Sequence, residues 1–252
     1  MPTYIAIPAN RFAELSNATI EEAGRYYLKG VHLSPGPENS ILMAATTGHI
    51  LSVRRIPADE CHGAANLPAG GLIVPAEKPL IQACRSKGKY PLPVSIRLAV
   101  SLTATGAVES VAVTVFNILA DQAATPGSWE NPVFILAGPG FIDASYPDFR
   151  RVIPKAANLP AAKDGAIPGR NHTSWDAAAL CVNPKLLETL ARSAGAEFVQ
   201  ILPEADPGNP RLVMTSDSNW QGVVMLASAE SIPSRPGRRP WLNPATEATE
   251  NC

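Results

Sequence analysis

The side chains that could do chemistry in this chain of 252 residues are few and lie far apart. The residue types that most often bind metals are four cysteines and four histidines: Cys61, Cys84, Cys181, Cys252, His32, His49, His62 and His172. No two cysteines form a C-x-x-C pair, and the histidines lack the spacing that holds a metal ion. We therefore expect neither a structural zinc site nor any other metal site.

Three further groups of residues could be taken for catalytic motifs. Cys61 and His62 are adjacent, and sequence neighbours rarely reach the geometry of a nucleophile and its base. The run 138–140 (Gly-Pro-Gly) is neither a phosphate-binding loop nor a dinucleotide fingerprint. Asp143 and Asp148 could be paired carboxylates, but Asp148 fits better as part of a structural Pro-Asp-Phe-Arg-Arg element. The sequence indicates a binding protein rather than an enzyme, and no cofactor is expected.

Basic residues recur with the spacing of a helix face. Two segments carry a pair of basic residues seven positions apart with a polar residue between them, a pattern that places all three on one side of a helix. The two sets are Lys78, Gln82 and Arg85, and Lys185, Thr189 and Arg192. When the first strand–helix unit is aligned with the second, Arg11 occupies the position of Lys78. Two interpretations stay open: an ordinary solvated face, or a surface that contacts phosphates without reading base sequence.

Composition fits a folded protein with many short elements. Hydrophobic residues make up 46% and charged residues 17%, and the length allows one large or two small domains. The 25 prolines are about twice the usual share, which favours rigid connections over a helical bundle. The formal net charge is −1, so any contact with nucleic acid must come from a local patch.

The sequence also indicates the cellular compartment of the protein. The first residues show no charged region followed by an apolar run, and no segment is long and apolar enough to span a membrane. The four separate cysteines fit free thiols in a reducing environment. We expect a cytoplasmic protein without membrane contact.

Periodicity and turn signals predict three units of similar order. The first has strands at 3–7, 25–33, 41–45 and 50–53 and a helix at 10–18. The second has strands at 71–74, 94–103, 108–119 and 133–137 and a helix at 75–87. The third has strands at 179–182, 198–202, 211–215 and 222–227 and a helix at 184–194. No fourth pattern is visible between about 135 and 175.

This repeat predicts an α+β fold of strand–helix–three-strand units. We expect residues 1–155 to form one complete domain of two units, 1–66 and 67–155. Residues 156–230 would form an abridged domain of the same kind. The Pro-rich tail 231–252 is predicted to be disordered.

Four stretches resemble one family, the bacterial DNA polymerase sliding clamp (β subunit). The run 146–155 (Tyr-Pro-Asp-Phe-Arg-Arg-Val-Ile-Pro-Lys) is similar to the signature that closes the clamp's middle domain. Residues 25–31 resemble its Arg-Tyr-Tyr-Leu-Asn-Gly strand, and 45–51 resemble its Ala-Thr-Asp-Gly-His-Arg-Leu loop. Residues 223–225 resemble its closing Val-Val-Met segment. The resemblance covers a middle domain and the second half of a last domain, without the family's first domain.

The resemblance implies a DNA-clamp fold with antiparallel sheets outside and helices inside, lining a channel for duplex DNA. It also implies a hydrophobic pocket for short peptide motifs of DNA polymerases and clamp loaders. In such a channel, the basic residues of the repeated helix faces would contact DNA: Arg11, Lys78, Arg85, Lys185 and Arg192. Those it implies for the pocket are Leu28, Thr46, His49, Leu51, Pro154, Val223 and Met225. Single apolar members such as Leu28 fit ordinary core positions equally well.

The chain departs from the family pattern at the pocket. Thr47 replaces the family's Asp, Ile50 replaces its Arg, and 226–228 (Leu-Ala-Ser) replaces Pro-Met-Arg. Two hypotheses follow. The chain is a clamp-like processivity factor that closes around DNA as a homo-oligomer, or it is a clamp-derived adaptor that binds partner proteins without encircling DNA.

Overall fold

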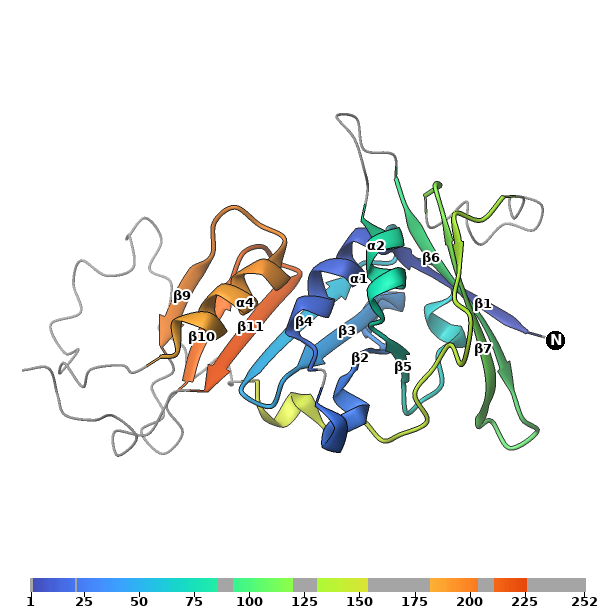
Figure 1. Cartoon of the computed structure of the whole chain (residues 1–252), viewed down its shortest axis with the longest axis horizontal. Helices are drawn as coiled ribbons and strands as arrows, with labels where there is room; N and C mark the ends of the chain where they lie inside the picture. The colour runs from blue at the N-terminus through green and yellow to red at the C-terminus, as the bar shows by residue number, and fades with distance from the viewer. Residues whose placement is uncertain are drawn as a thin grey trace, which may run out of the picture.

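The computed structural model describes residues 2–20, 22–85, 93–119, 131–153, 182–203 and 211–225. Its architecture is α+β, as expected, with antiparallel sheets and a few short helices (Figure 1). The expected strand at 179–182, the stretch 156–174 and the tail 231–252 lie outside the described residues, apart from Val182, which is not in a strand. Among the helices described, none has the length and apolar character that a membrane crossing requires.

The described elements follow the expected order, without the strand expected at 179–182, and are grouped here by the three expected units. Unit one consists of β1 (Thr3–Pro8), α1 (Ala9–Leu15), β2 (Gly30–Pro35), β3 (Ile41–Thr46) and β4 (Ile50–Ile56). Unit two consists of β5 (Leu72–Pro75), α2 (Lys78–Cys84), β6 (Ser95–Leu102), β7 (Val108–Phe116) and β8 (Phe134–Ile135). The described part of unit three consists of α4 (Pro184–Ala194), β9 (Gln200–Pro203), β10 (Arg211–Thr215) and β11 (Trp220–Met225). Short 3-10 turns are η1 (Ser16–Ala18), η2 (Ala23–Leu28), η3 (Pro37–Asn39), η4 (Ala64–Asn66) and η5 (Phe149–Arg151).

Local signals explain where α4 begins and ends. Asn183 is the N-cap, and its side-chain oxygen accepts a hydrogen bond from the backbone N–H of Lys185 at 3.0 Å. Pro184 occupies the first turn, where its missing N–H costs nothing. Gly195 ends the helix in the left-handed region with φ of 61°. The predicted bounds 184–194 are therefore confirmed.

Two predicted elements were wrong in extent. Residues 25–28, expected to be strand, belong to η2, and β2 begins only at Gly30. There the backbone of β2 meets β5 so closely that a Cβ on Gly30 would lie 2.5 Å from the carbonyl oxygen of Val74. The helix expected at 75–87 is shorter, Lys78–Cys84, because Pro79 has no N–H and must sit in the first turn.

Units one and two exchange their first strands. β1 pairs with β6 of unit two, and β5 pairs with β2 of unit one. The two resulting sheets have the strand orders β1-β6-β7-β8 and β5-β2-β3-β4-β11-β10-β9. The seven-stranded sheet continues into unit three because β4 pairs antiparallel with β11. Helices α2, α1 and α4 lie side by side in one row (Figure 1).

One hydrophobic core joins all three units. Phe12 of α1, Leu80 of α2 and Leu190 of α4 are fully buried in it. Alternation along each strand sends every second side chain to this helix side of the seven-stranded sheet. On β4, Ile50 and Ile56 face the helices, whereas Leu51 and Val53 face the opposite side, here called the outer face.

Candidate functional site

A second, smaller apolar cluster covers the outer face of the seven-stranded sheet. Its buried members come from three strands and one 3-10 turn: Ala44, Leu51, Val223 and Phe149. The segment 146–153 crosses this face and packs Tyr146, Val152 and Ile153 against the cluster. The run that is most distinctive in sequence is thus fixed against β3, β4 and β11.

A stacked ring pair anchors the start of this segment. The rings of Tyr146 and His32 lie 4.7 Å apart and are nearly parallel, at 10°. The Tyr146 hydroxyl donates to the carbonyl of Ala44 at 3.4 Å, and burial raises the pKa of the phenol well above its ordinary value. His32 Nε2 lies 3.2 Å from the carbonyl oxygen of Gly70, and burial lowers the pKa of its imidazole. This burial therefore favours a neutral histidine.

Asp148 has a structural role in the same segment. Its carboxylate accepts from the backbone N–H of Arg150 at 3.3 Å and from Nε of Arg151 at 3.1 Å, which caps η5. The guanidinium of Arg150 lies 5.3 Å from the centroid of the Phe149 ring. The interpretation of Asp148 as part of a structural Pro-Asp-Phe-Arg-Arg element is confirmed.

Beside this segment lies a pocket of about 360 Å³, here called the outer pocket. Six of the seven residues expected for the peptide site line it: Leu28, Thr46, His49, Leu51, Val223 and Met225. The seventh, Pro154, lies outside the described residues. The lining also includes residues that were not predicted: Arg25, Tyr27, Gly48, Ile50, Pro147, Asp148, Phe149 and Val152. All eight lie within the runs 25–31, 45–51 and 146–155, so those motifs were the signal that could have found them.

The turn between β3 and β4 is held by its own threonines. Thr46 Oγ1 donates to the carbonyl of Ile50 at 2.6 Å and accepts from Gly48 N–H at 2.9 Å. Thr47 Oγ1 accepts from the N–H groups of His49 and Ile50 at 3.3 and 3.4 Å. A hydroxyl at position 47 thus makes the type of contact that an Asp side chain makes in such turns. Replacement of the family's Asp by Thr47 leaves the loop closed.

The two sides of the outer pocket are joined by a polar junction on the helix side. Arg54 of β4 is 2% exposed and donates to the carbonyl of Ala194 at the end of α4. Its guanidinium also lies 3.5 Å from the carboxylate of Asp217 and 3.8 Å from that of Glu14. The Glu14 side chain can lie this close to the end of α4 only because residue 195 is glycine. A Cβ on Gly195 would lie 2.1 Å from the Glu14 side chain.

A hydroxyl pair completes the junction. Ser193 of α4 donates to Ser52 of β4 at 2.8 Å, and the indole N–H of Trp220 donates to the same Ser52 oxygen at 2.9 Å. These groups are buried, so their mutual hydrogen bonds replace those to water. Unit three is therefore attached through both a strand pair and a buried polar network.

The five residues expected to contact DNA lie on the helix row or directly at the end of one of its helices. Arg11 is on α1, Lys78 on α2, and Lys185 and Arg192 on α4, while Arg85 follows α2. Two of them form ion pairs within their own helix: Arg11 with Glu14 at 3.2 Å and Arg192 with Glu188 at 2.6 Å. The row lies on the opposite side of the sheet from the outer pocket.

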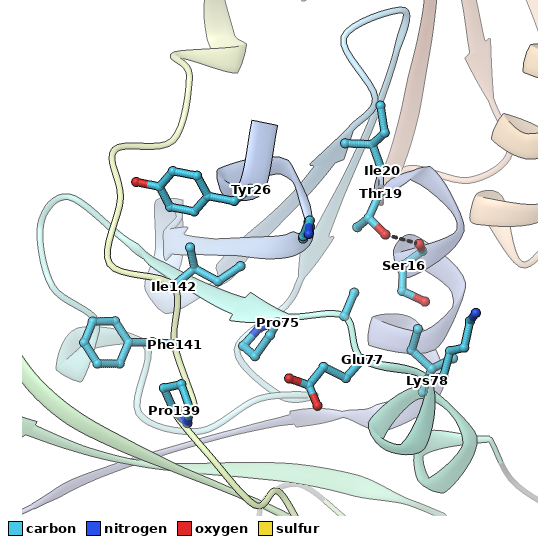
Figure 2. Close-up of a pocket in the computed structure, with 13 residues that line it drawn as sticks. Ser16, Thr19, Ile20, Tyr26, Pro75, Glu77, Lys78, Pro139, Phe141 and Ile142 are labelled. Carbon is cyan, nitrogen blue, oxygen red and sulfur yellow. Dashed lines mark hydrogen bonds between the residues drawn. The ribbon is translucent and has the colours of Figure 1, made fainter. Parts of the chain in front are cut away.

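A larger cavity of about 860 Å³ lies between η2, the start of α2 and the segment 139–142. Figure 2 shows Tyr26, Phe141 and Pro139 toward one end and Thr19, Ser16 and Lys78 toward the other. No sequence motif pointed to it. Over the part of the chain that the structure describes, no three or more His, Cys, Asp or Glu residues come together as a metal site.

No protein-family model matches the chain, and no curated protein matches it in sequence. Solved structures do match it. The DnaN sliding clamp (DNA polymerase III subunit beta) of Bartonella birtlesii, bound to griselimycin, aligns with a TM-score of 0.52 and 15% identity. The C. crescentus beta sliding clamp aligns with a TM-score of 0.51 and 19% identity. DNA polymerase III subunit beta of Borrelia burgdorferi aligns with a TM-score of 0.50 and 13% identity.

These alignments cover 89%, 89% and 90% of this chain and 66%, 65% and 64% of the three clamps. The fold is therefore that of bacterial sliding clamps, as the sequence motifs led us to expect. The chain has a clamp-like fold and spans less than two thirds of the length of those clamps.

Proposed function

We propose that this chain is a non-catalytic, clamp-like accessory protein of DNA replication that binds short peptides of partner proteins in its outer pocket. The partners would be DNA polymerase and clamp-loader-type proteins in the cytoplasm. The observation that carries the proposal is the outer pocket itself. Six residues that the motifs implied, from three separate stretches of sequence, line it.

The chemistry of the outer pocket suits a peptide. Leu51, Val223 and Phe149 form an apolar floor, and His49 and Arg25 supply polar groups at its edge. A volume of about 360 Å³ lies in the range of small-ligand sites, which combine an apolar lining with a few polar groups. Such a surface takes apolar anchor side chains of a short segment and orients its backbone.

For DNA, the helix row is the surface that would encircle or contact the duplex. Lys78 and Lys185 are exposed on α2 and α4, and their charge would attract phosphates without reading sequence.

The second candidate is an adaptor that binds partner proteins through the outer pocket and does not encircle DNA. The ion pairs of Arg11 with Glu14 and of Arg192 with Glu188 favour it, because each neutralises a basic side chain on the helix row. A net charge of −1 points the same way.

Binding of griselimycin, the ligand of the Bartonella birtlesii clamp, tests the outer pocket by calorimetry. We expect the wild type to bind and Met225→Glu, at a side chain 36% exposed, to weaken binding about tenfold or more. The matched control is Ile135→Glu on β8, outside the pocket, which should bind as the wild type does. Absent binding, or equal binding by all three proteins, would refute the proposal.

Retention on DNA separates the two candidates. An encircling protein stays on nicked circular DNA at high salt and slides off after linearisation. A protein that only contacts the helix binds both forms equally and leaves both as salt rises. An adaptor binds neither form and still binds griselimycin.

A further inference from the structure

The cavity of about 860 Å³ between η2, the start of α2 and the segment 139–142 is here called the η2 cavity, and it plays no part in the proposed function. Its volume lies in the range of small-ligand sites, which reaches about 1,000 Å³. Tyr26 and Lys29 line this cavity, whereas Tyr27 and Leu28 line the outer pocket. The two cavities share no described lining residue, so they are two separate sites.

Backbone hydrogen bonds hold the walls of the η2 cavity in place. The N–H of Ile142 donates to the carbonyl of Ile73 at 2.8 Å, which holds the segment 139–142 against the edge of β5. The N–H of Ala76 donates to the carbonyl of Lys29 at 2.9 Å, which ties the residues before α2 to the end of η2. The cavity is therefore formed before any ligand binds.

One part of the η2 cavity is apolar and aromatic. Pro75 is buried, and Ile81 and Phe141 are half-buried and pack against the main core. The side chain of Tyr26 is 53% exposed and lies toward the same end of the cavity as Phe141 (Figure 2). A ligand that covers these side chains removes apolar surface from water, which favours a molecule with an aromatic ring system.

The rest of the η2 cavity is polar, and its described lining carries one net positive charge. Lys29 and Lys78 are exposed, and Glu77 is the one acidic residue of the described lining. The hydroxyls of Ser16 and Thr19 donate to backbone carbonyls at 2.7 and 2.8 Å, so the lysines are left to contact an anion. Lys78 lies at the opposite end of the cavity from the aromatic rings (Figure 2).

We propose that the η2 cavity binds a small amphipathic anion, a molecule with an aromatic ring system and one acidic group. The ring system lies against Tyr26 and Phe141, and the acidic group lies toward Lys78 and Lys29. Because these lysines are exposed, salt screens their attraction for the acidic group and weakens binding. The inference is independent of the proposed function, since the outer pocket has a different lining.

Two fluorescent probes that differ by one acidic group test the proposal. Anilinonaphthalene sulfonate carries a sulfonate, and phenylnaphthylamine has the same ring system without it. We expect the wild type to bind the sulfonate about fivefold more tightly or better, because two ammonium groups attract it. This preference should shrink as the salt concentration rises. Fluorescence titration of each probe at low and high salt measures both effects.

Lys29→Glu tests the charged part of the η2 cavity. The side chain is exposed, so the substitution leaves the core intact. It should remove the preference for the sulfonate and leave the affinity for the neutral probe almost unchanged. The matched control is Arg151→Glu, which makes the same reversal at a side chain that is 85% exposed and lines neither cavity. That variant should retain the preference of the wild type.

Tyr26→Ser tests the aromatic part. We expect both probes to bind about fivefold more weakly or worse, because the substitution removes aromatic surface that the ring system would cover. The matched control is Phe198→Ser, at an aromatic side chain that is 80% exposed and lines neither cavity. It should bind both probes as the wild type does.

Griselimycin and Met225→Glu separate this site from the outer pocket. Neither should change the binding of the probes, and a protein that binds the sulfonate but not griselimycin would refute the proposed function alone. The inference is overturned by a wild type that binds neither probe or binds both equally. Loss of probe binding in Met225→Glu would overturn it as well, and so would Lys29→Glu and Tyr26→Ser proteins that bind as their controls do.

Discussion

At the scale of single residues, the contact between His32 and Tyr146 ties the segment 146–153 to the sheet. His32 is 6% exposed, its Nδ1 has no hydrogen-bond partner among the described residues, and its ring stacks on Tyr146. Burial is the main cause of its lowered pKa, the bond to Gly70 opposes the shift, and the charge of Arg150 adds to it. Charging this ring would place a cation against the aromatic segment that lines the outer pocket.

The sign of the pH effect follows from this lowered pKa. Below about pH 6.5 the unfolded chain takes up a proton at His32 before the folded protein does, so the free energy of unfolding falls. The loss ends below the folded-state pKa. We expect His32→Phe, which keeps a ring against Tyr146 but cannot be protonated, to show a smaller loss between pH 7 and pH 5. Urea unfolding at the two pH values measures it.

The control for this prediction is His62→Gln, because the His62 side chain is exposed. That variant should retain the full pH dependence of the wild type. An unchanged pH dependence in His32→Phe would show that other groups cause it.

At the scale of elements, the junction of β4, β11 and α4 fixes the position of one side of the outer pocket relative to the other. Thr46, His49 and Leu51 lie on or beside β3 and β4, whereas Val223 and Met225 lie on β11. The backbone N–H of Met225 donates to the carbonyl of His49 at 3.0 Å, which ties the two sides at the pocket itself. The strand pair thus forms the pocket, and the polar groups beneath it hold α4 in place.

Arg54→Met tests the polar part of this junction. The substitution leaves the Ala194 carbonyl at the end of α4 without its partner, which should lower the free energy of unfolding by about 1–3 kcal/mol. Chemical denaturation measures the loss. The neighbouring Arg55→Met is the control, since Arg55 pairs at 2.5 Å with a Glu38 side chain that is 77% exposed, and such pairs contribute at most about 1 kcal/mol. Equal losses in the two variants would contradict the assigned role of Arg54.

At the scale of the whole molecule, the sheet separates two surfaces with different chemistry. The outer face carries the apolar pocket, and the helix row on the other side carries the basic residues. Under the proposed function, a partner peptide and a duplex would bind on opposite sides of the sheet and would not compete. Two of the five basic residues, Arg11 and Arg192, are ion-paired within their helices, which reduces the attraction that they would contribute.

Charge reversal on the helix row tests contact with DNA. In Lys78→Glu/Lys185→Glu, we expect affinity for duplex DNA to fall and its log–log salt slope to decrease by about 0.9 for each phosphate that is no longer neutralised. Fluorescence anisotropy at several salt concentrations measures both. Arg55→Glu/Arg151→Glu makes the same change in net charge away from the helix row and should have a smaller effect. Equal effects would show that the helix row is an ordinary solvated surface.

Much of the local structure could be predicted from the sequence. Periodicity predicted the bounds of α4 correctly, and the cap at Asn183 and the left-handed Gly195 explain why the helix begins and ends there. Tyr26 and Tyr27 favour strand in isolation, yet they lie in η2, because β5 pairs with β2 only from Gly30 onward. The junction around Arg54 was not predicted, since its partners Glu14, Ala194 and Asp217 are remote in sequence.

The sequence by itself determined the order of elements, the repeat of three units and the motif runs that line the outer pocket. These depend on side-chain periodicity, caps and turn residues, which act over a few neighbouring positions. Only the tertiary structure decided that units one and two exchange strands, that β4 pairs with β11, and that β9 is the last described strand of the seven-stranded sheet. The reason is that strand pairing joins residues far apart in the chain, and the burial of the shared core selects among the pairings that local patterns allow.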